Sequence, residues 1–142
     1  MTMYRKILVG LDGSEAARHA FAHALELAAV TGATVHVLSV EERLPAYAAT
    51  VGEVQDEQRY ENQYYHELHV EAEGLAAQKR VALTHEIVPG HAAQVLAQTA
   101  KMGGFDLIVV GHTGHSRLHN LFLGSTADRI VEHSPCAVLV VR

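Results

Sequence analysis

The stretch that decides the fold is residues 106–141, "DLIVVGHTGHSRLHNLFLGSTADRIVEHSPCAVLVV". It opens with an almost continuous apolar run at 106–111 and closes with a second one at 136–141. Runs of this length are typical of strands that are buried on both faces. Between them, the spacing predicts a helix that begins near Ser125 and ends before Pro135. A strand, a helix and a strand in succession predict two parallel strands joined by a right-handed crossover.

The same alternation extends over the rest of the chain. Apolar runs predict strands at 6–12, 33–40 and 82–88, and helical spacing predicts helices at about 14–32, 53–80 and 91–102. We therefore expect an α/β fold with an open five-stranded parallel sheet and helices on both faces, formed by a single domain over residues 1–142.

The segment 41–65 is the exception, because Pro45 and Gly52 interrupt it. We expect a loop that precedes the helix at 53–80. Three tyrosines near the start of this helix could form a patch that faces a ligand or a partner, but packing on their neighbours is favoured for Tyr60, Tyr64 and Tyr65.

Composition excludes several classes of function. The formal net charge is −5 and there is no run of Lys or Arg, which argues against non-specific nucleic-acid binding. Cys136 is the only cysteine and is expected in a buried strand, so neither an internal disulfide nor a CxxC pair is possible. There is no signal peptide and no apolar stretch of membrane-spanning length, and a cytoplasmic protein is expected.

Two predicted strand ends carry residues that suit a ligand site. "GLDGS" (10–14) follows the first strand and "VVGHTGH" (109–115) ends the fourth. In a sheet of order 3-2-1-4-5 these strands are neighbours at the point where the winding direction reverses, which is where open parallel sheets bind ligands. Both loops would then face one crevice.

The residue types in these loops favour an anionic ligand. Gly111 and Gly114 leave room for a phosphate group. Gly124, Ser125 and Thr126 open a helix whose free N–H groups attract anions. Asp12 would be repelled by phosphates unless it holds a Mg²⁺ ion or accepts a hydrogen bond from a ribose hydroxyl.

Each of these residues also has a structural interpretation. Asp12 with Glu15, and Ser125 with Asp128, have the spacing of helix capping boxes. The glycines fit ordinary turns. The standard phosphate-loop motifs GxxxxGK[ST] and GxGxxG are absent.

Eleven histidines raise the question of a metal site. His112, His115 and His119 are close in sequence, but zinc sites usually add a Cys, Asp or Glu ligand, so we interpret this cluster as phosphate donors in an exposed loop. His66 and His69 share a helical face. His36 lies in an apolar strand and is expected to be half-buried and hydrogen-bonded. The others are expected at ordinary surface positions, including His19, His23, His85, His91 and His133.

The full spacing Gly111-x2-Gly114-x9-Gly124-Ser125 resembles the nucleotide-binding signature of the universal stress protein family. The likeness covers the whole chain, including "KILVGLDGSEAARHAFAHALELA" at its start and the block from Phe105 to Arg142. It implies a flavodoxin-like fold and a homodimer that pairs the last strands, 136–141, antiparallel. Within the family, the glycine signature marks the subgroup that binds ATP.

Roles at matching positions follow from this resemblance alone. Asp12 would lie near the ribose or a phosphate-bound Mg²⁺ or Mn²⁺, Leu11 would lie against the base, and Val40 would pair with adenine through its backbone. The phosphates would be held by Gly111, Gly114, Gly124, Ser125 and Thr126, with His112 and His115 as further donors. His115 stands where many members have arginine, so binding is expected to strengthen as the pH falls.

These expectations rank three functions. The first is a stress-response regulatory protein that binds ATP with Mg²⁺ as a ligand. The second is a slow ATPase or nucleotide-transfer enzyme, although no GxSxG motif or other catalytic residue is apparent. The third is a protein–protein adaptor in which the glycine signature is not used.

Overall fold

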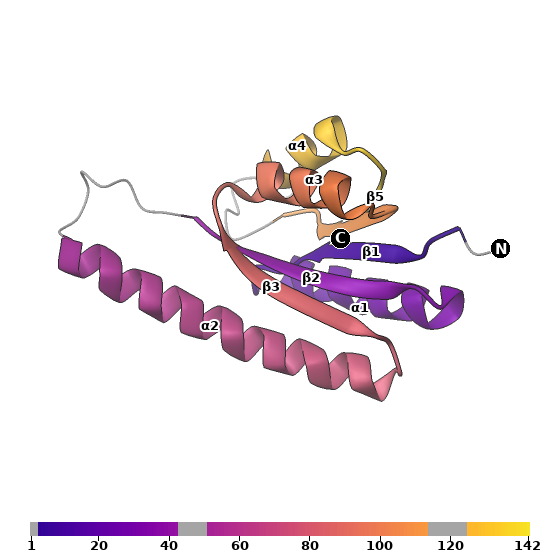
Figure 1. Cartoon of the computed structure of the whole chain (residues 1–142), viewed down its shortest axis with the longest axis horizontal. Coiled ribbons are helices and arrows are strands. Elements are labelled where there is room, and N and C mark those ends of the chain that lie inside the picture. The colour runs from indigo at the N-terminus through magenta and orange to yellow at the C-terminus, as the bar shows by residue number, and fades with distance from the viewer. Residues whose placement is uncertain (1–2, 43–50, 114–124) are drawn as a thin grey trace.

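The computed structural model describes residues 3–42, 51–113 and 125–142. Over these residues strands and helices alternate strictly (Figure 1): β1 (Lys6–Gly10), α1 (Glu15–Thr31), β2 (Thr34–Glu41), α2 (Val51–Gln78), β3 (Leu83–Pro89), α3 (Ala92–Gly103), β4 (Leu107–Gly111), α4 (Ser125–His133) and β5 (Ala137–Val141). The strands form one parallel sheet of order β3-β2-β1-β4-β5. This confirms the predicted fold class and strand order.

The strand β1 lies at the centre and is held by partners far away in the sequence. Ile7 pairs with Val35 of β2 on one side and with Leu107 of β4 on the other. The carboxylate of Asp106 fixes this register, because its Oδ2 accepts the backbone N–H of Arg5 at 2.9 Å. The winding direction reverses between β1 and β4, as the sequence predicts.

Helices cover both faces of the sheet, and the three inner strands β1, β2 and β4 bury side chains on both faces. Ile7 and Val9 of β1 pack with α1 and α2 in one core cluster. Leu8 points to the other face, where it packs with Leu96 of α3 and Ile130 of α4. In Figure 1, α3 and α4 accordingly lie on one side of the sheet and α1 and α2 on the other.

The start of α1 corrects one interpretation of Asp12. The N-cap of α1 is Ser14, whose Oγ accepts the backbone N–H of Ala17 at 3.2 Å. Asp12 instead accepts the N–H of Ser14 at 2.9 Å, in the turn before the helix. The capping box of Asp12 with Glu15 is therefore wrong, because β1 ends at Gly10 and the helix begins later than that pairing requires. The end of α1 is as expected: Gly32 adopts φ 79°, the left-handed conformation of a C-cap.

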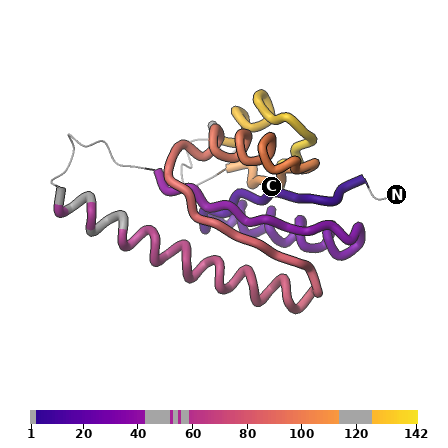
Figure 2. The backbone as a smooth tube through the Cα atoms, viewed as in Figure 1, coloured from indigo at the N-terminus to yellow at the C-terminus, as the bar shows by residue number. Residues whose placement is uncertain are grey.

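The helix α2 is longer than its neighbours and runs along the whole length of β2 and β3 (Figure 2). It begins at Val51, so the expected loop is shorter than predicted, and residues 43–50 lie outside the described part of the chain. Tyr65 is buried and contacts the ring of Tyr64 edge-on, as expected, whereas Tyr60 is 78% exposed and does not pack as predicted.

The position of Cys136 differs from the prediction. Cys136 is half-buried and precedes β5, so it does not lie inside a buried strand as predicted.

Across the described ranges, no helix combines the length and the apolar character that crossing a membrane requires.

Candidate functional site

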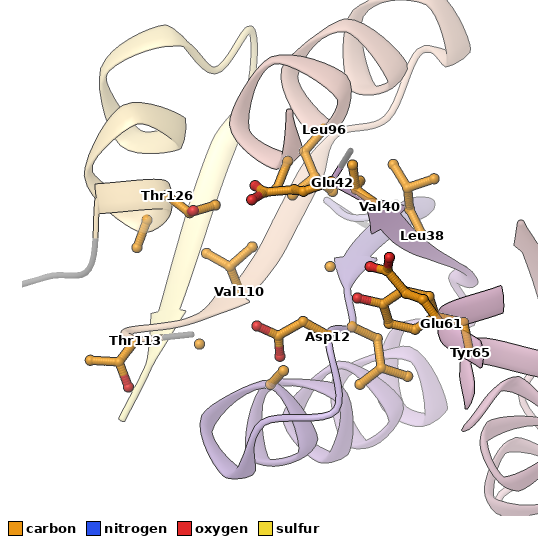
Figure 3. A pocket seen from close by; sticks show the side chains of 16 residues that line it. Asp12, Leu38, Val40, Glu42, Glu61, Tyr65, Leu96, Val110, Thr113 and Thr126 are labelled. Carbon is orange, nitrogen blue, oxygen red and sulfur yellow. The ribbon is translucent and has the colours of Figure 1, made fainter. Parts of the chain in front are cut away.

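A cavity of about 350 Å³ opens at the carboxyl ends of β1, β2 and β4 (Figure 3). This is the reversal point of the sheet, where consecutive crossovers leave on opposite faces. The cavity is lined by Gly10, Leu11, Asp12, Ala17, Leu38, Val40, Glu42, Glu61, Tyr65, Ala92, Leu96, Val110, Gly111, Thr113, Thr126 and Ala127.

Apolar side chains form much of the cavity wall, and three helices begin at its rim. Leu11, Leu38 and Leu96 are each no more than 3% exposed. Near the rim are the first turns of α1, α3 and α4, represented by Ala17, Ala92 and Thr126. Helix N-termini carry partial positive charge and unpaired N–H groups, so this geometry attracts anions.

Three carboxylates oppose this attraction. Asp12, Glu42 and Glu61 all line the cavity. In Figure 3, Asp12 and Glu61 lie on one side of it, while Glu42 lies toward Leu96. A bare polyphosphate would be repelled by such a set, whereas a divalent cation or sugar hydroxyl groups would be attracted. The site therefore suits a ligand that brings a cation or several hydroxyl donors together with its negative charge.

Tyr65 reaches the cavity from α2 between two of these carboxylates. Burial is the main reason why the pKa of Tyr65 is raised well above its usual range, and the negative charges of Glu61 and then Asp12 raise it further. The phenol is therefore neutral at physiological pH and retains its proton as a hydrogen-bond donor. Its ring adds an aromatic surface to the wall.

Gly111 ends β4 beside the first turn of α1, and this position explains why it is a glycine. A Cβ atom at Gly111 would lie 2.7 Å from the carbonyl carbon of Ala16 and 2.8 Å from its Cβ. The glycine thus permits close packing of helix on strand, which is a different reason from room for a phosphate or from a turn.

The structure places the predicted site residues in three groups. Lining the cavity are Leu11, Asp12, Val40, Gly111 and Thr126. His112 is not among the lining residues: its backbone N–H donates to the carbonyl of Val141 at 2.8 Å, and within the described ranges its buried Nδ1 has no hydrogen-bond partner. Outside the described residues are Gly114, His115, His119 and Gly124, while Ser125 is described only as the first residue of α4.

Sequence reasoning missed the contribution of α2 and of the segment after β2. Glu42, Glu61 and Tyr65 were not proposed as site residues, although all three line the cavity. The tyrosine spacing was the one available signal. Helical periodicity shows which residues share a face, but not which end of the sheet that face approaches.

Two of the histidine predictions have clear outcomes. His36 is half-buried, with Nδ1 at 2.6 Å from Thr84 Oγ1 and Nε2 at 3.2 Å from Glu86 Oε1, as expected. His85 is exposed on β3, as expected, and its ring is in addition hydrogen-bonded to His69 and Glu73 of α2. In the part of the chain that the structure describes, no three His, Cys, Asp or Glu side chains are grouped to hold a metal ion.

Comparisons with known proteins agree with this architecture. The family model described as "Universal stress protein family" matches residues 3–142. The universal stress protein of the QAH/OAS sulfhydrylase 3′ region of Thermus aquaticus is 33% identical over 140 residues, covering 99% of this chain and 100% of its own length. The structure of the universal stress protein UspA from Lactobacillus plantarum superimposes with a TM-score of 0.91 at 30% identity, covering 100% of both chains.

Two more distant structures hold nucleotides. A universal stress protein in complex with cAMP has a TM-score of 0.77 at 24% identity, covering 99% of this chain and 99% of its own. The universal stress protein from Archaeoglobus fulgidus in complex with dAMP has a TM-score of 0.65 at 19% identity, covering 99% of this chain and 100% of its own. At these identities the likeness is one of fold.

Proposed function

Because this chain belongs to the universal stress protein family, we propose that its cavity binds an adenine nucleotide, ATP together with Mg²⁺, as the ligand of a stress-response regulatory protein. The observation that carries this proposal is the cavity itself. It combines an apolar wall, three helix N-termini and the end of β2 at the reversal point of the sheet.

The apolar part of the cavity suits a purine ring. Leu11, Leu38 and Val40 provide flat contact surface, and Val40 lies next to the carboxyl end of β2, where its backbone groups can pair with the edge of the base. The sugar hydroxyls would face Asp12, since a carboxylate accepts hydrogen bonds from hydroxyl donors. The structures of relatives with cAMP and dAMP support an adenine nucleotide as the ligand class.

The phosphates would extend toward the first turn of α4. Thr126 contributes its hydroxyl and the free N–H groups of the helix end. Mg²⁺ is required in this scheme because Asp12, Glu42 and Glu61 would otherwise repel a triphosphate. Asp12 is the carboxylate that we propose contacts the ion.

We further propose that two chains associate through β5. β5 is an edge strand that pairs only with β4 in the described sheet. Its Leu139 is 38% exposed, and an apolar edge strand gains stability by pairing with a second copy. Sedimentation of the protein as a monomer at micromolar concentration would contradict this part of the proposal.

A calorimetric titration of the nucleotide-stripped protein with Mg·ATP tests the main proposal. We expect micromolar binding, about −8 kcal/mol. Ala92→Phe should abolish it by filling the cavity from the first turn of α3. Ala77→Phe makes the same change at an exposed position of α2 and should bind as the parent does. If neither Mg·ATP nor AMP binds the parent protein, the proposal is wrong.

A further inference from the structure

A series of four polar contacts connects the cavity wall to the surface of α2. Ser39 Oγ lies 2.5 Å from the carbonyl oxygen of Leu11 and 2.7 Å from His69 Nε2. His69 Nδ1 lies 3.2 Å from His85 Nδ1, and His85 Nε2 contacts the carboxylate of Glu73. The series begins at a residue that lines the cavity and ends at solvent.

Burial makes the inner contacts depend on one another. Ser39 and His69 are each 1% exposed, whereas the side chains of His85 and Glu73 are 33% and 54% exposed. Because water does not reach Ser39 or His69, a missing proton there cannot be replaced by a solvent hydrogen bond. Burial also excludes Ser39 as a nucleophile for an external substrate.

A count of protons fixes the direction of every hydrogen bond. The carbonyl of Leu11 can only accept, so Ser39 donates to Leu11, His69 Nε2–H donates to Ser39, and His85 Nδ1–H donates to His69. The last contact then needs its own proton, on His85 Nε2 or on Glu73. Four contacts require four protons, and the two neutral rings and the hydroxyl supply three. The fourth is a titratable proton shared by His85 and Glu73.

Loss of this shared proton reverses the direction in which the hydrogen bonds of the series are donated. The remaining ring proton of His85 stays on Nε2, because a hydrogen bond to the ionised Glu73 is the strongest one available. His85 Nδ1 then becomes an acceptor, His69 donates from Nδ1, and Ser39 donates to His69 Nε2. The carbonyl of Leu11 is thereby left without its hydroxyl donor.

Burial keeps His69 neutral in both states. The pKa of His69 is lowered from 6.5 to about 4, mainly by burial and to a smaller extent by His85, His66 and His36, while Glu73 acts in the opposite direction. His66 and Glu73 belong to α2, His36 to β2 and His85 to β3. His69 itself therefore stays neutral at physiological pH.

We infer that the Ser39–His69–His85–Glu73 series is a proton-controlled switch that regulates the cavity by holding or releasing the carbonyl of Leu11. The geometry of the contacts carries the switch, and only its effect on the ligand rests on the proposed function. Leu11 lines the cavity next to Asp12, so releasing its carbonyl loosens the wall that would contact the nucleotide.

Nitrogen-15 NMR of the histidine rings tests the switch without any ligand. From about pH 5 to about pH 8, the range in which histidines lose their proton, His69 should change from the Nε2–H to the Nδ1–H tautomer. If His69 keeps one tautomer over the whole range, the switch does not exist.

Glu73→Gln gives a sharper test, at a position where the side chain is 54% exposed. The amide of glutamine can donate to His85 Nε2, which supplies the fourth proton without a titratable group. His69 should therefore remain the Nε2–H tautomer at every pH. Glu67→Gln, at an exposed position of the same helix, should titrate as the parent protein does. A Glu73→Gln protein that switches like the parent would overturn the proton count.

The affinity for Mg·ATP tests the effect on the cavity. Between the two ends of the pH range, the parent protein should lose about fivefold in affinity relative to Glu73→Gln, which corresponds to one net hydrogen bond. The comparison with Glu73→Gln cancels any pH effect of the phosphates or of His115. A tautomer change without this relative loss would overturn the regulatory role. Absence of all nucleotide binding would refute the proposed function, and the NMR result would still decide the switch.

Discussion

Replacement of Gly111 by alanine separates two explanations of the same residue. If Gly111 is needed for packing, the new Cβ must displace the first turn of α1, because it meets the carbonyl carbon of Ala16 at 2.7 Å and its oxygen at 2.9 Å. These are backbone atoms, so rotation of a side chain cannot relieve the contact. Overpacking of this kind typically costs 1–3 kcal/mol, and we expect about 2 kcal/mol here.

Thermal unfolding of the nucleotide-free protein measures this cost. A loss of about 2 kcal/mol lowers the midpoint by roughly 4–8 °C in a chain of this size. The control is Gly74→Ala, since a Cβ at Gly74 of α2 meets nothing within 4 Å. That change should stabilise the protein by up to about 1 kcal/mol, because alanine is the better helix former. If Gly111→Ala leaves the midpoint unchanged and only weakens nucleotide binding, the packing argument is wrong and the phosphate explanation is favoured.

Three further changes have defined outcomes. Ser14→Ala removes the N-cap of α1 and should lower the free energy of unfolding by about 1 kcal/mol in urea titrations; an unchanged midpoint would contradict the assigned cap. The pKa of His69 is about 4 in the folded protein against 6.5, so its neutral ring contributes stability that is complete above pH 6.5 and is lost as the pH falls toward 4. His69→Gln should therefore flatten the acid side of a stability–pH profile by up to ~3 kcal/mol, and an equally steep profile in the variant would argue against it. Asp12→Asn should weaken binding of ATP about tenfold in Mg²⁺ and much less in EDTA; equal losses under both conditions would remove the proposed contact with the ion.

Much of the fold follows from local sequence patterns. The apolar runs at β1, β2 and β4 leave little choice but strands buried on both faces, and Gly32 ends α1 where a left-handed residue is needed. The reversal point between β1 and β4 follows from the strand order. These features depend on neighbours in the sequence and on general rules of chain topology.

The parts that sequence reasoning missed depend on contacts across the sheet. Glu61 and Tyr65 line the cavity because this part of α2 lies beside the carboxyl end of β2. No local sequence pattern predicts that placement. The surface position of His85 is predictable from the sequence, but its contact with His69 is not, because alternation along β3 does not reveal which residue of α2 lies opposite. From the sequence, Gly111 is explained by a ligand or a turn, whereas the residue that a Cβ atom at Gly111 would meet is Ala16, which lies far earlier in the sequence.

The central position of β1 has a consequence for how the protein is made. β1 is synthesised well before its partner β4, which begins at Leu107, and the contact of Arg5 with Asp106 joins residues 101 apart. At 5–20 residues per second, this second edge of β1 waits roughly 5–20 s for its partner to be synthesised. During that interval the nascent β1–α1–β2 unit displays an unpaired apolar strand edge. Codon choice and chaperone access between those two segments therefore bear directly on the yield of folded protein.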